Sequence, residues 1–383
     1  MLPLMSLIVQ LLTLDFRQHT GPAPADGAAP TIITDCGNFT LDLKQHGGEE
    51  KELKSKREKL KGCNKGFGAQ AEMVREELTF RLNDEEYKNW LKAGRCLLIL
   101  KDGLLPFTDQ QLRAFHGDLL NHYPPLRRPC ETSSCKPRGN TLVSVCRVCS
   151  EWQRVILKHH RQPDGTIHWT NCFPRYWRTD HWELAKAYMP RGQTKVNRAD
   201  EFDASALLNL INYCDCFSSV DPKLVRQVIQ CRNELMHSCE FRVTDDWMRH
   251  YRTALRHFVQ QLSFVPHMLT VGRQIEDMLT VDLSIRVFGV DRLDSAGPSA
   301  DSDPDSPESG AESVSRWEAE LLREMLRECL HAANEEDEDA KAHDAEQLKR
   351  LRGFLQANKD LGEEFSSELQ AIDSLEAKGG EEG

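Results

Sequence analysis

Residues 221–238 read DPKLVRQVIQCRNELMHS, a pattern that predicts an amphipathic helix. At about 3.6 residues per turn, its apolar side chains fall on one stripe. That stripe contains Leu224, Val225, Val228, Ile229, Leu235 and Met236. Arg232 falls inside it, where a charged side chain is costly unless it is paired or lies at an interface or site. The stretch therefore predicts a buried helix in which Arg232 is paired with an acid or lies at an interface or site.

Other parts of the chain show the same helical spacing, and few stretches read as strands. Helices are predicted at residues 83–98, 108–120, 202–211, 222–236, 244–262 and 267–279. A cap residue followed by early acids marks several of the starts. We therefore expect an all-α fold, with residues 73–290 as a helical body that is interrupted by an insertion at 121–200.

Charge is unevenly spread along the chain. A length of 383 residues with 39% apolar content allows about two or three domains with real cores. Residues 291–383 carry 26 acidic and 10 basic residues, a net charge of −16, whereas residues 1–290 carry 39 basic and 34 acidic residues, a net charge of +5. Only the body could therefore attract a polyanion.

The two ends of the chain differ from the body. Residues 1–72 are predicted to be a poorly ordered leader, because residues 15–72 are rich in Gly, Ala and Pro and then in Lys and Glu, with no strong periodicity. The apolar start, Met1 to Leu14, lacks a basic region, which argues against a secretory signal. Residues 291–315 are predicted to be an acidic Ser/Pro linker. Residues 316–378 are predicted to form a helical hairpin or short coiled coil that could bind protein partners.

Composition also limits the compartment. No stretch is long enough to span a membrane. The thirteen cysteines are odd in number, and several lie in helical patterns, so they do not resemble a small disulfide framework. A reducing compartment, cytoplasmic or nuclear, is the expectation.

Six candidate metal ligands lie in the insertion. They are Cys130, Cys135, Cys146, Cys149, His168 and Cys172. The Cys146-x2-Cys149 pair leads into an apolar helix, as in a zinc knuckle, and two thiolates at that spacing can hold one tetrahedral ion. The second pair is either Cys130 with Cys135 or His168 with Cys172. A structural zinc ion is expected; the alternative is a loop-rich insertion with reduced cysteines.

The insertion is also basic and aromatic. It carries 14 basic against 6 acidic residues, a net charge of +8, and four of the seven tryptophans: Trp152, Trp169, Trp177 and Trp182. Cations interleaved with aromatic rings can track phosphates and stack bases. Alternatively, the tryptophans form a small core around a metal, which we favour for most of them. A role for Arg175, Arg178 and Arg191 stays open.

Five motifs together resemble the vertebrate family catalogued as X-chromosome open reading frame thirty-eight. They are residues 85–98 (EEYKNWLKAGRCLL), 146–149 (CRVC), 168–172 (HWTNC), 187–192 (AYMPRG) and 231–238 (CRNELMHS). The resemblance covers about residues 73–380. Because the family begins near Met73, it implies that residues 1–72 are an isoform or gene-model extension.

Residues 203–262 also resemble the HEPN superfamily, in the version found in a DAZ-interacting zinc-finger ubiquitin ligase. HEPN domains are small helical bundles that often dimerise, and many carry an Arg-x4-6-His signature. Arg232 and His237 fit it with four residues between them. The resemblance implies metal-independent RNA cleavage at a dimer interface, with Arg232 on the scissile phosphate, His237 as general acid or base, and Asn233 in positioning.

The spacing of this motif sets a geometric condition. Residues five apart on one helix point about 140° away from each other. Arg232 and His237 can converge only if the helix ends between them or if a second protomer supplies half of the site. The expectation is thus a homodimeric HEPN module that binds RNA or a phosphate ligand; whether it also cleaves RNA, as a metal-independent ribonuclease, stays open. The alternative is a non-catalytic adaptor in which Arg232 pairs with Asp203 or Glu234 and His237 caps the helix.

Overall fold

A computed structural model describes most of the chain after the leader. The described ranges are 77–132, 134–142, 145–162, 165–196, 198–238, 240–283, 307–332 and 338–379. The all-α prediction is confirmed, because the regular elements in these ranges are helices, accompanied by two isolated β-bridges. None of the described helices is both long and apolar enough to cross a bilayer. The predicted leader and residues 291–306 of the predicted linker lie outside the described ranges.

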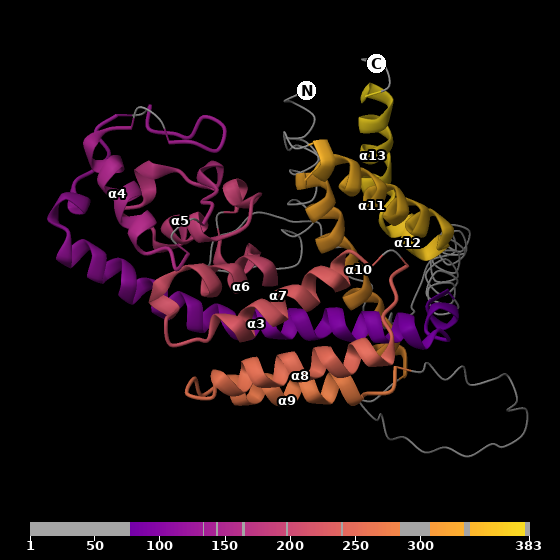
Figure 1. Ribbon diagram of the computed structural model, residues 1–383. Coiled ribbons are helices and arrows are strands. Elements are labelled where there is room, and N and C mark those ends of the chain that lie inside the picture. The colour runs from indigo at the N-terminus through magenta and orange to yellow at the C-terminus, as the bar shows by residue number, and fades with distance from the viewer. Residues whose placement is uncertain are drawn as a thin grey trace, which may run out of the picture. The chain divides into compact units, whose positions relative to one another are not determined.

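The longest helix, α3 (Glu85–His122), is the axis of the body (Figure 1). It begins where the sequence predicts, because the Asp84 carboxylate accepts from the backbone N–H groups of Glu86 and Tyr87. The prediction of two separate helices, at 83–98 and 108–120, was wrong. Pro106 lies inside the single helix, and the hydroxyl of Thr108 donates to two carbonyls just before the proline.

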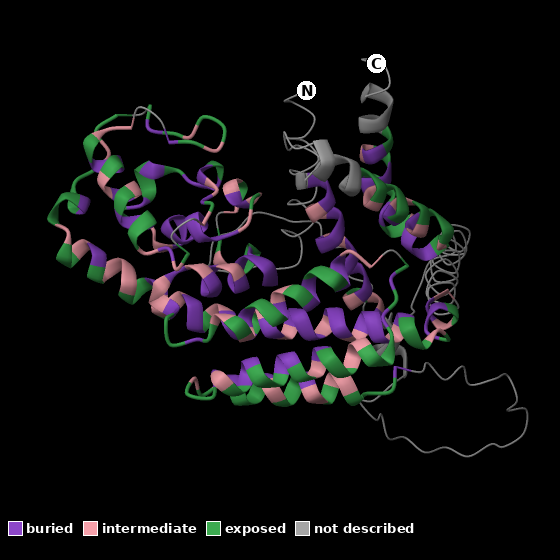
Figure 2. Cartoon of the chain, in the orientation of Figure 1, coloured by how far each residue is buried: buried purple, intermediate pink, exposed green. Residues whose placement is uncertain are grey.

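Burial explains why α3 continues through a proline. Removing one backbone donor and crowding the preceding turn costs about 3 kcal/mol. Leu100 and Leu104 before Pro106, and Phe107 and Leu112 after it, are all buried. Figure 2 shows the buried residues following α3 over most of its length. A break at Pro106 would expose one of these two groups, so packing of the core outweighs the local signal.

Four further helices complete the bundle around α3. They are α6 (Ala204–Tyr213), α7 (Pro222–Met236), α8 (Asp245–Gln261) and α9 (Met268–Thr280). All four lie where the periodicity predicts them. The pair α8 and α9 lies along one side of α3, and α6 and α7 lie along another (Figure 1). Side-chain caps at Asp203, Asp221 and Thr244 begin α6, α7 and α8.

The insertion consists of short helices and loops. Its α-helices are α4 (Arg147–Lys158) and α5 (His181–Ala185), joined by 3-10 turns. The Cys146–Cys149 pair leads into α4, as predicted. All four tryptophans of the insertion are buried, with exposed fractions between 0% and 9%. This burial supports the interpretation that the tryptophans form a small core rather than a stacking surface.

The C-terminal helices are α10 (Pro307–Ala332), α11 (Glu338–Ala357), α12 (Lys359–Glu364) and α13 (Ser366–Gly379). One compact unit spans Glu76–Phe354 and includes α10; Leu355–Gly383 belong to a second unit. The structure corrects the predicted linker, because α10 begins inside it. Proline is well suited to the first position of a helix, and α10 begins at Pro307. Since α10 packs on α3, it belongs to the body.

Candidate functional site

Arg232 lies on the buried face of α7, as its place in the apolar stripe predicts. Its side chain is only 2% exposed, and it is among the largest fully buried side chains of the described residues. The helix brings it there because Val225, Val228 and Leu235 share the same face and pack into the core. A guanidinium removed from water must be paired, so the identity of its partners decides what it can do.

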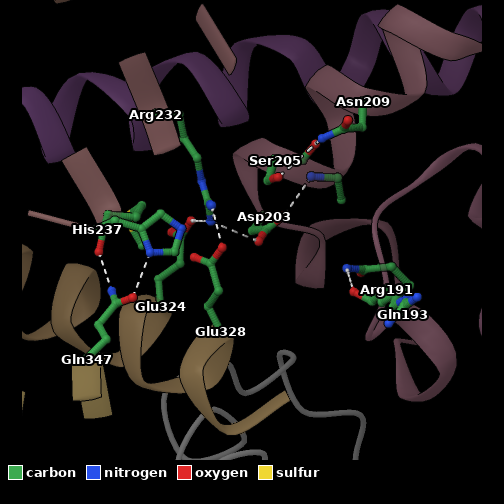
Figure 3. Close-up of polar contacts among 12 residues, drawn as sticks. Arg191, Gln193, Asp203, Ser205, Asn209, Arg232, His237, Glu324, Glu328 and Gln347 are labelled. Carbon is green, nitrogen blue, oxygen red and sulfur yellow. Dashed lines mark hydrogen bonds and ion pairs between the residues drawn. The ribbon is translucent and has the colours of Figure 1, made fainter. Parts of the chain in front are cut away.

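Three carboxylates surround the guanidinium (Figure 3). The closest is Glu328, whose Oε1 is 2.7 Å from Arg232 Nη1. Asp203 Oδ2 and Glu324 Oε1 each lie 3.6 Å from Arg232 Nη2. Asp203 is the N-cap of α6, whereas both glutamates come from α10. The arrangement therefore joins three helices around one cation.

The predicted alternatives for the partner of Arg232 were Asp203 and Glu234, and the structure separates them. Asp203 does pair with Arg232. Glu234 instead accepts from Gln230 and from the indole N–H of Trp247 on the exposed side of α7. The sequence reasoning missed Glu324 and Glu328, because it assigned α10 to a separate tail. Their only sequence signal was an acidic pair one helical turn apart beside an apolar stripe.

The balance of charge in this cluster is negative. Burial lowers the pKa of Arg232, but Glu328, Asp203 and Glu324 outweigh that effect and raise it above its ordinary value. Burial, and next the Asp203 carboxylate, raise the pKa of Glu324 to about 7. With three carboxyl groups around one guanidinium, the site repels a further anion. A phosphate could reach Arg232 only by displacing α10.

His237 lies at the C-terminal cap of α7, one residue beyond Met236. Its ring is half-buried, and its Nδ1 is 2.6 Å from the side-chain oxygen of Gln347 in α11 (Figure 3). The amide nitrogen of Gln347 donates to the Met236 carbonyl at 2.6 Å. Because that contact fixes the amide orientation, the oxygen faces the ring and Nδ1 carries the proton. Asn233 is exposed, and its carbonyl accepts from the His237 backbone N–H.

A small cavity of about 190 Å³ lies beside His237. Among the described residues, it is lined by His237, Ser238, Phe241, Met325, Glu346, Gln347, Arg350 and Leu351. Arg232 does not line it. The two motif residues therefore serve different contacts: the guanidinium binds α10, and the imidazole binds α11.

A second candidate site lies in the insertion. The Sγ atoms of Cys130, Cys135, Cys146 and Cys149 all lie within 4.8 Å of one another. Cys130 Sγ and Cys146 Sγ are 4.0 Å apart. In a tetrahedral zinc–thiolate site the sulfur atoms are about 3.8 Å apart, because each lies about 2.3 Å from the ion. The four cysteines can therefore hold a metal ion.

Backbone N–H groups point at the sulfur atoms of this group, as expected around thiolates. The Cys146 N–H donates to Cys135 Sγ at 3.1 Å, and the Glu131 N–H donates to Cys146 Sγ at 3.5 Å. Burial alone would raise the pKa of Cys146, but backbone N–H groups, that of Cys149 first, lower it to about 7. Cys146 therefore favours the deprotonated form that binds metal, whereas burial raises the pKa of Cys135 and of Cys149.

The other two predicted ligands lie outside this group in the described part of the chain. His168 Nδ1 accepts from Arg191 Nε at 3.2 Å. Burial, followed by the Arg191 charge, lowers the pKa of His168 to about 4. Cys172 is buried beside Glu183 and Lys186, and its burial raises its pKa. Of the two second pairs that the sequence allowed, the structure brings Cys130 and Cys135 to the Cys146–Cys149 pair.

The family model described as a domain of unknown function, DUF4559, matches residues 81–382. The chain belongs to the DUF4559 family. A mouse protein described as an uncharacterized CXorf38 homolog is 40% identical over 306 residues, which cover 79% of this chain and 93% of the mouse protein. No solved structure matches the chain significantly.

These matches confirm the resemblance to the X-chromosome open reading frame thirty-eight family. The DUF4559 match takes in the body, the insertion and the C-terminal helices, so Arg232 and its α10 partners lie in the same family domain. It also contains all four clustered cysteines. Both candidate sites are therefore features of this domain.

Proposed function

We propose that this DUF4559 member is a non-catalytic protein-interaction adaptor with a HEPN-like helical domain. In this proposal, the Arg232–His237 motif holds the chain's own C-terminal helices and does not bind an RNA phosphate. The ion pair of 2.7 Å between Arg232 and Glu328 is the observation that carries it. The segment that resembles HEPN domains spans α6, α7 and α8, which pack against the long α3.

The chemistry of RNA cleavage is the reason for preferring the adaptor. A guanidinium assists that reaction by donating hydrogen bonds to the phosphorane oxygens as charge develops. The two terminal nitrogens of Arg232 face Glu328, Asp203 and Glu324. The proton on His237 Nδ1 is directed at Gln347. The motif is thus committed to internal contacts from two C-terminal helices.

A cleavage assay tests the non-catalytic part of the proposal. The full chain is incubated with RNA and EDTA, alongside a Glu324→Gln/Glu328→Gln variant that releases Arg232 from two charged partners. We expect intact RNA with both proteins. Cleavage by either one, abolished by adding His237→Ala, would reveal a masked nuclease and overturn the proposal.

Hydrogen exchange tests the other part of the proposal, that Arg232 holds α10 against the body. Arg232→Ala should speed exchange of the backbone amides of α10, because it leaves the buried Glu324 and the half-buried Glu328 without their cation. Arg226→Ala is the matched control, since Arg226 is an exposed arginine on the same helix. Equal exchange in α10 for both variants would show that Arg232 does not hold this helix. The expected homodimer stays a prediction, which sedimentation equilibrium of the full chain can test.

We also propose that Cys130, Cys135, Cys146 and Cys149 bind one structural zinc ion. The mutual approach of the four sulfur atoms to within 4.8 Å supports this proposal. Four thiolates complete the coordination of zinc and leave no position for a substrate, so the ion would stabilise the loops of the insertion. Elemental analysis of the purified full chain should find about one zinc per chain. A folded, metal-free protein would contradict it.

A further inference from the structure

Residues 173–178, with the sequence FPRYWR, present two aromatic rings to solvent from the insertion. Phe173 is 37% exposed and Tyr176 is 49% exposed, although Trp177 beside them is fully buried. The two exposed rings pack edge to face, with centroids 6.4 Å apart and ring planes at 72°. Large aromatic side chains gathered on a surface often mark a binding site.

The backbone of this segment is firmly held. His116 Nε2 donates to the Trp177 carbonyl at 2.7 Å. The Tyr176 carbonyl accepts from the backbone N–H groups of Thr179 and Asp180, each at 2.9 Å. The Phe173 N–H donates to the Glu183 carboxylate. The rings project from a backbone that is already ordered. Binding of a ligand that stacks on them therefore costs little conformational entropy in this segment.

Two exposed cations alternate with the rings. The Arg175 guanidinium lies 5.9 Å from the centroid of the Tyr176 ring. Neither Arg175 nor Arg178 forms an ion pair within the ranges that the structure describes. The nearest acids along the chain have other partners: Glu183 pairs with Lys186 at 2.8 Å, and Asp180 caps α5. The net charge of +8 for residues 121–200 adds a positive field.

We propose that residues 173–178 bind single-stranded nucleic acid. Bases would stack on Phe173 and Tyr176, while Arg175 and Arg178 contact the phosphates. Stacking requires exposed base faces, which a single strand offers and a duplex hides. An acidic peptide would satisfy the arginines but not the two rings. This function goes beyond the proposed adaptor, and it places the nucleic-acid contact on the insertion and away from Arg232.

Binding of a fluorescent single-stranded RNA of about 12 nucleotides to the full chain tests the proposal. Replacing both rings, as Phe173→Leu/Tyr176→Leu, keeps apolar side chains but removes the stacking faces. We expect Kd to rise on the order of tenfold or more. Phe80→Leu is the control, because Phe80 is also exposed and lies outside the insertion; its Kd should match wild type.

The charged residues give a second readout. Arg175→Gln/Arg178→Gln should reduce the slope of log K against log salt by about 1.4, since each phosphate contact on a single strand contributes about 0.7. Arg226→Gln, an exposed arginine on α7, should leave the slope unchanged. Single-stranded DNA serves as a parallel probe; equal affinity assigns the surface to single strands in general, and tighter RNA binding assigns it to RNA.

Three results would overturn the proposal. Wild-type affinity in the Phe173→Leu/Tyr176→Leu variant would remove stacking. Duplex RNA that binds as tightly as the single strand would point to charge alone. Competition by polyglutamate as effective as competition by unlabelled RNA would assign the surface to an acidic protein.

Discussion

Arg81 and Glu318 form a buried ion pair with two hydrogen bonds. Arg81 Nε and Nη2 lie 2.6 and 2.7 Å from the two carboxylate oxygens of Glu318, and the side chains are 4% and 0% exposed. The Tyr87 hydroxyl also donates to Glu318. This contact joins α10 to the residues at the start of α3. Because both charges lie away from water, the pair stabilises the fold only while both partners are present.

Glu318→Ala should therefore lower the free energy of unfolding by about 3–5 kcal/mol, because it leaves a buried guanidinium uncompensated. Replacing both partners by apolar residues and removing the Tyr87 hydroxyl that donates to Glu318, as Arg81→Met/Tyr87→Phe/Glu318→Leu, should recover most of that loss. Urea denaturation measures the free energy of unfolding of both variants. Asp200→Ala, which removes an exposed pair with Arg198, should cost less than about 1 kcal/mol. A similar cost for Glu318→Ala would mean that the pair is solvated.

Two glycines of α3 offer a test of how α10 packs. A Cβ at Gly94 would lie 2.1 Å from Leu321 Cδ2 and 3.0 Å from its Cγ, so the buried leucine would have to move. Gly94→Ala should cost about 1–3 kcal/mol from overpacking, despite the better helix propensity of alanine. A Cβ at Gly117 would meet nothing within 4 Å, so Gly117→Ala should stabilise by about 0.5–1 kcal/mol. Thermal unfolding that moves both variants in the same direction would contradict this packing.

Local sequence signals predicted much of the body. Caps and apolar spacing located α6, α7, α8 and α9, because both depend on neighbours within a turn or two. They also predicted a buried Arg232. Its main partner, Glu328, lies 96 residues away along the chain. No local pattern predicts which distant carboxylate will contact a buried cation. The pairing of Arg232 with Glu324 and Glu328 of α10 is therefore visible only in the tertiary structure.

The predictions that failed or stayed open have two different physical causes. Pro106 is a strong local signal for a helix end, yet the buried stripe on both sides of it keeps α3 continuous. The cysteine spacing predicted a metal site but allowed two choices for the second pair. In the insertion, the sequence allowed the tryptophans as stacking residues, but they are buried and the exposed rings belong to Phe173 and Tyr176. Periodicity is informative on long helices and much less so in short irregular segments.

The acidic cluster around Arg232 predicts a pH dependence. Burial, and next the Asp203 carboxylate, raise the pKa of Glu324 to about 7, above its usual value of about 4.3. The folded protein therefore binds this proton more tightly than the unfolded chain. The contribution of protonated Glu324 to stability is complete below about pH 4.3 and is lost as pH rises through about 7.

Accordingly, the free energy of unfolding should contain a component, on the order of 2 kcal/mol, that falls between about pH 5 and 8. Glu324→Gln should remove this component and should be more stable than wild type at about pH 8. Urea titrations across that range measure it. Glu320→Gln on the same helix is the control and should keep the wild-type profile. An unchanged profile in Glu324→Gln would mean that Glu324 is ionised throughout.

The four-cysteine cluster makes the last prediction, which concerns its ligand set. Cys130→Ser and Cys146→Ser should each reduce bound zinc from about one ion per chain to a small fraction, because three thiolates hold a structural ion less tightly than four. His168→Ala should retain the ion, since its ring contacts Arg191 outside the cluster. Cys172→Ala, a buried cysteine outside the cluster, controls for loss of a thiol as such. Zinc loss in His168→Ala at wild-type thermal stability would assign the fourth position to histidine. Equal zinc loss in all four variants would mean that zinc binding depends on folding of the insertion and not on these sulfur atoms.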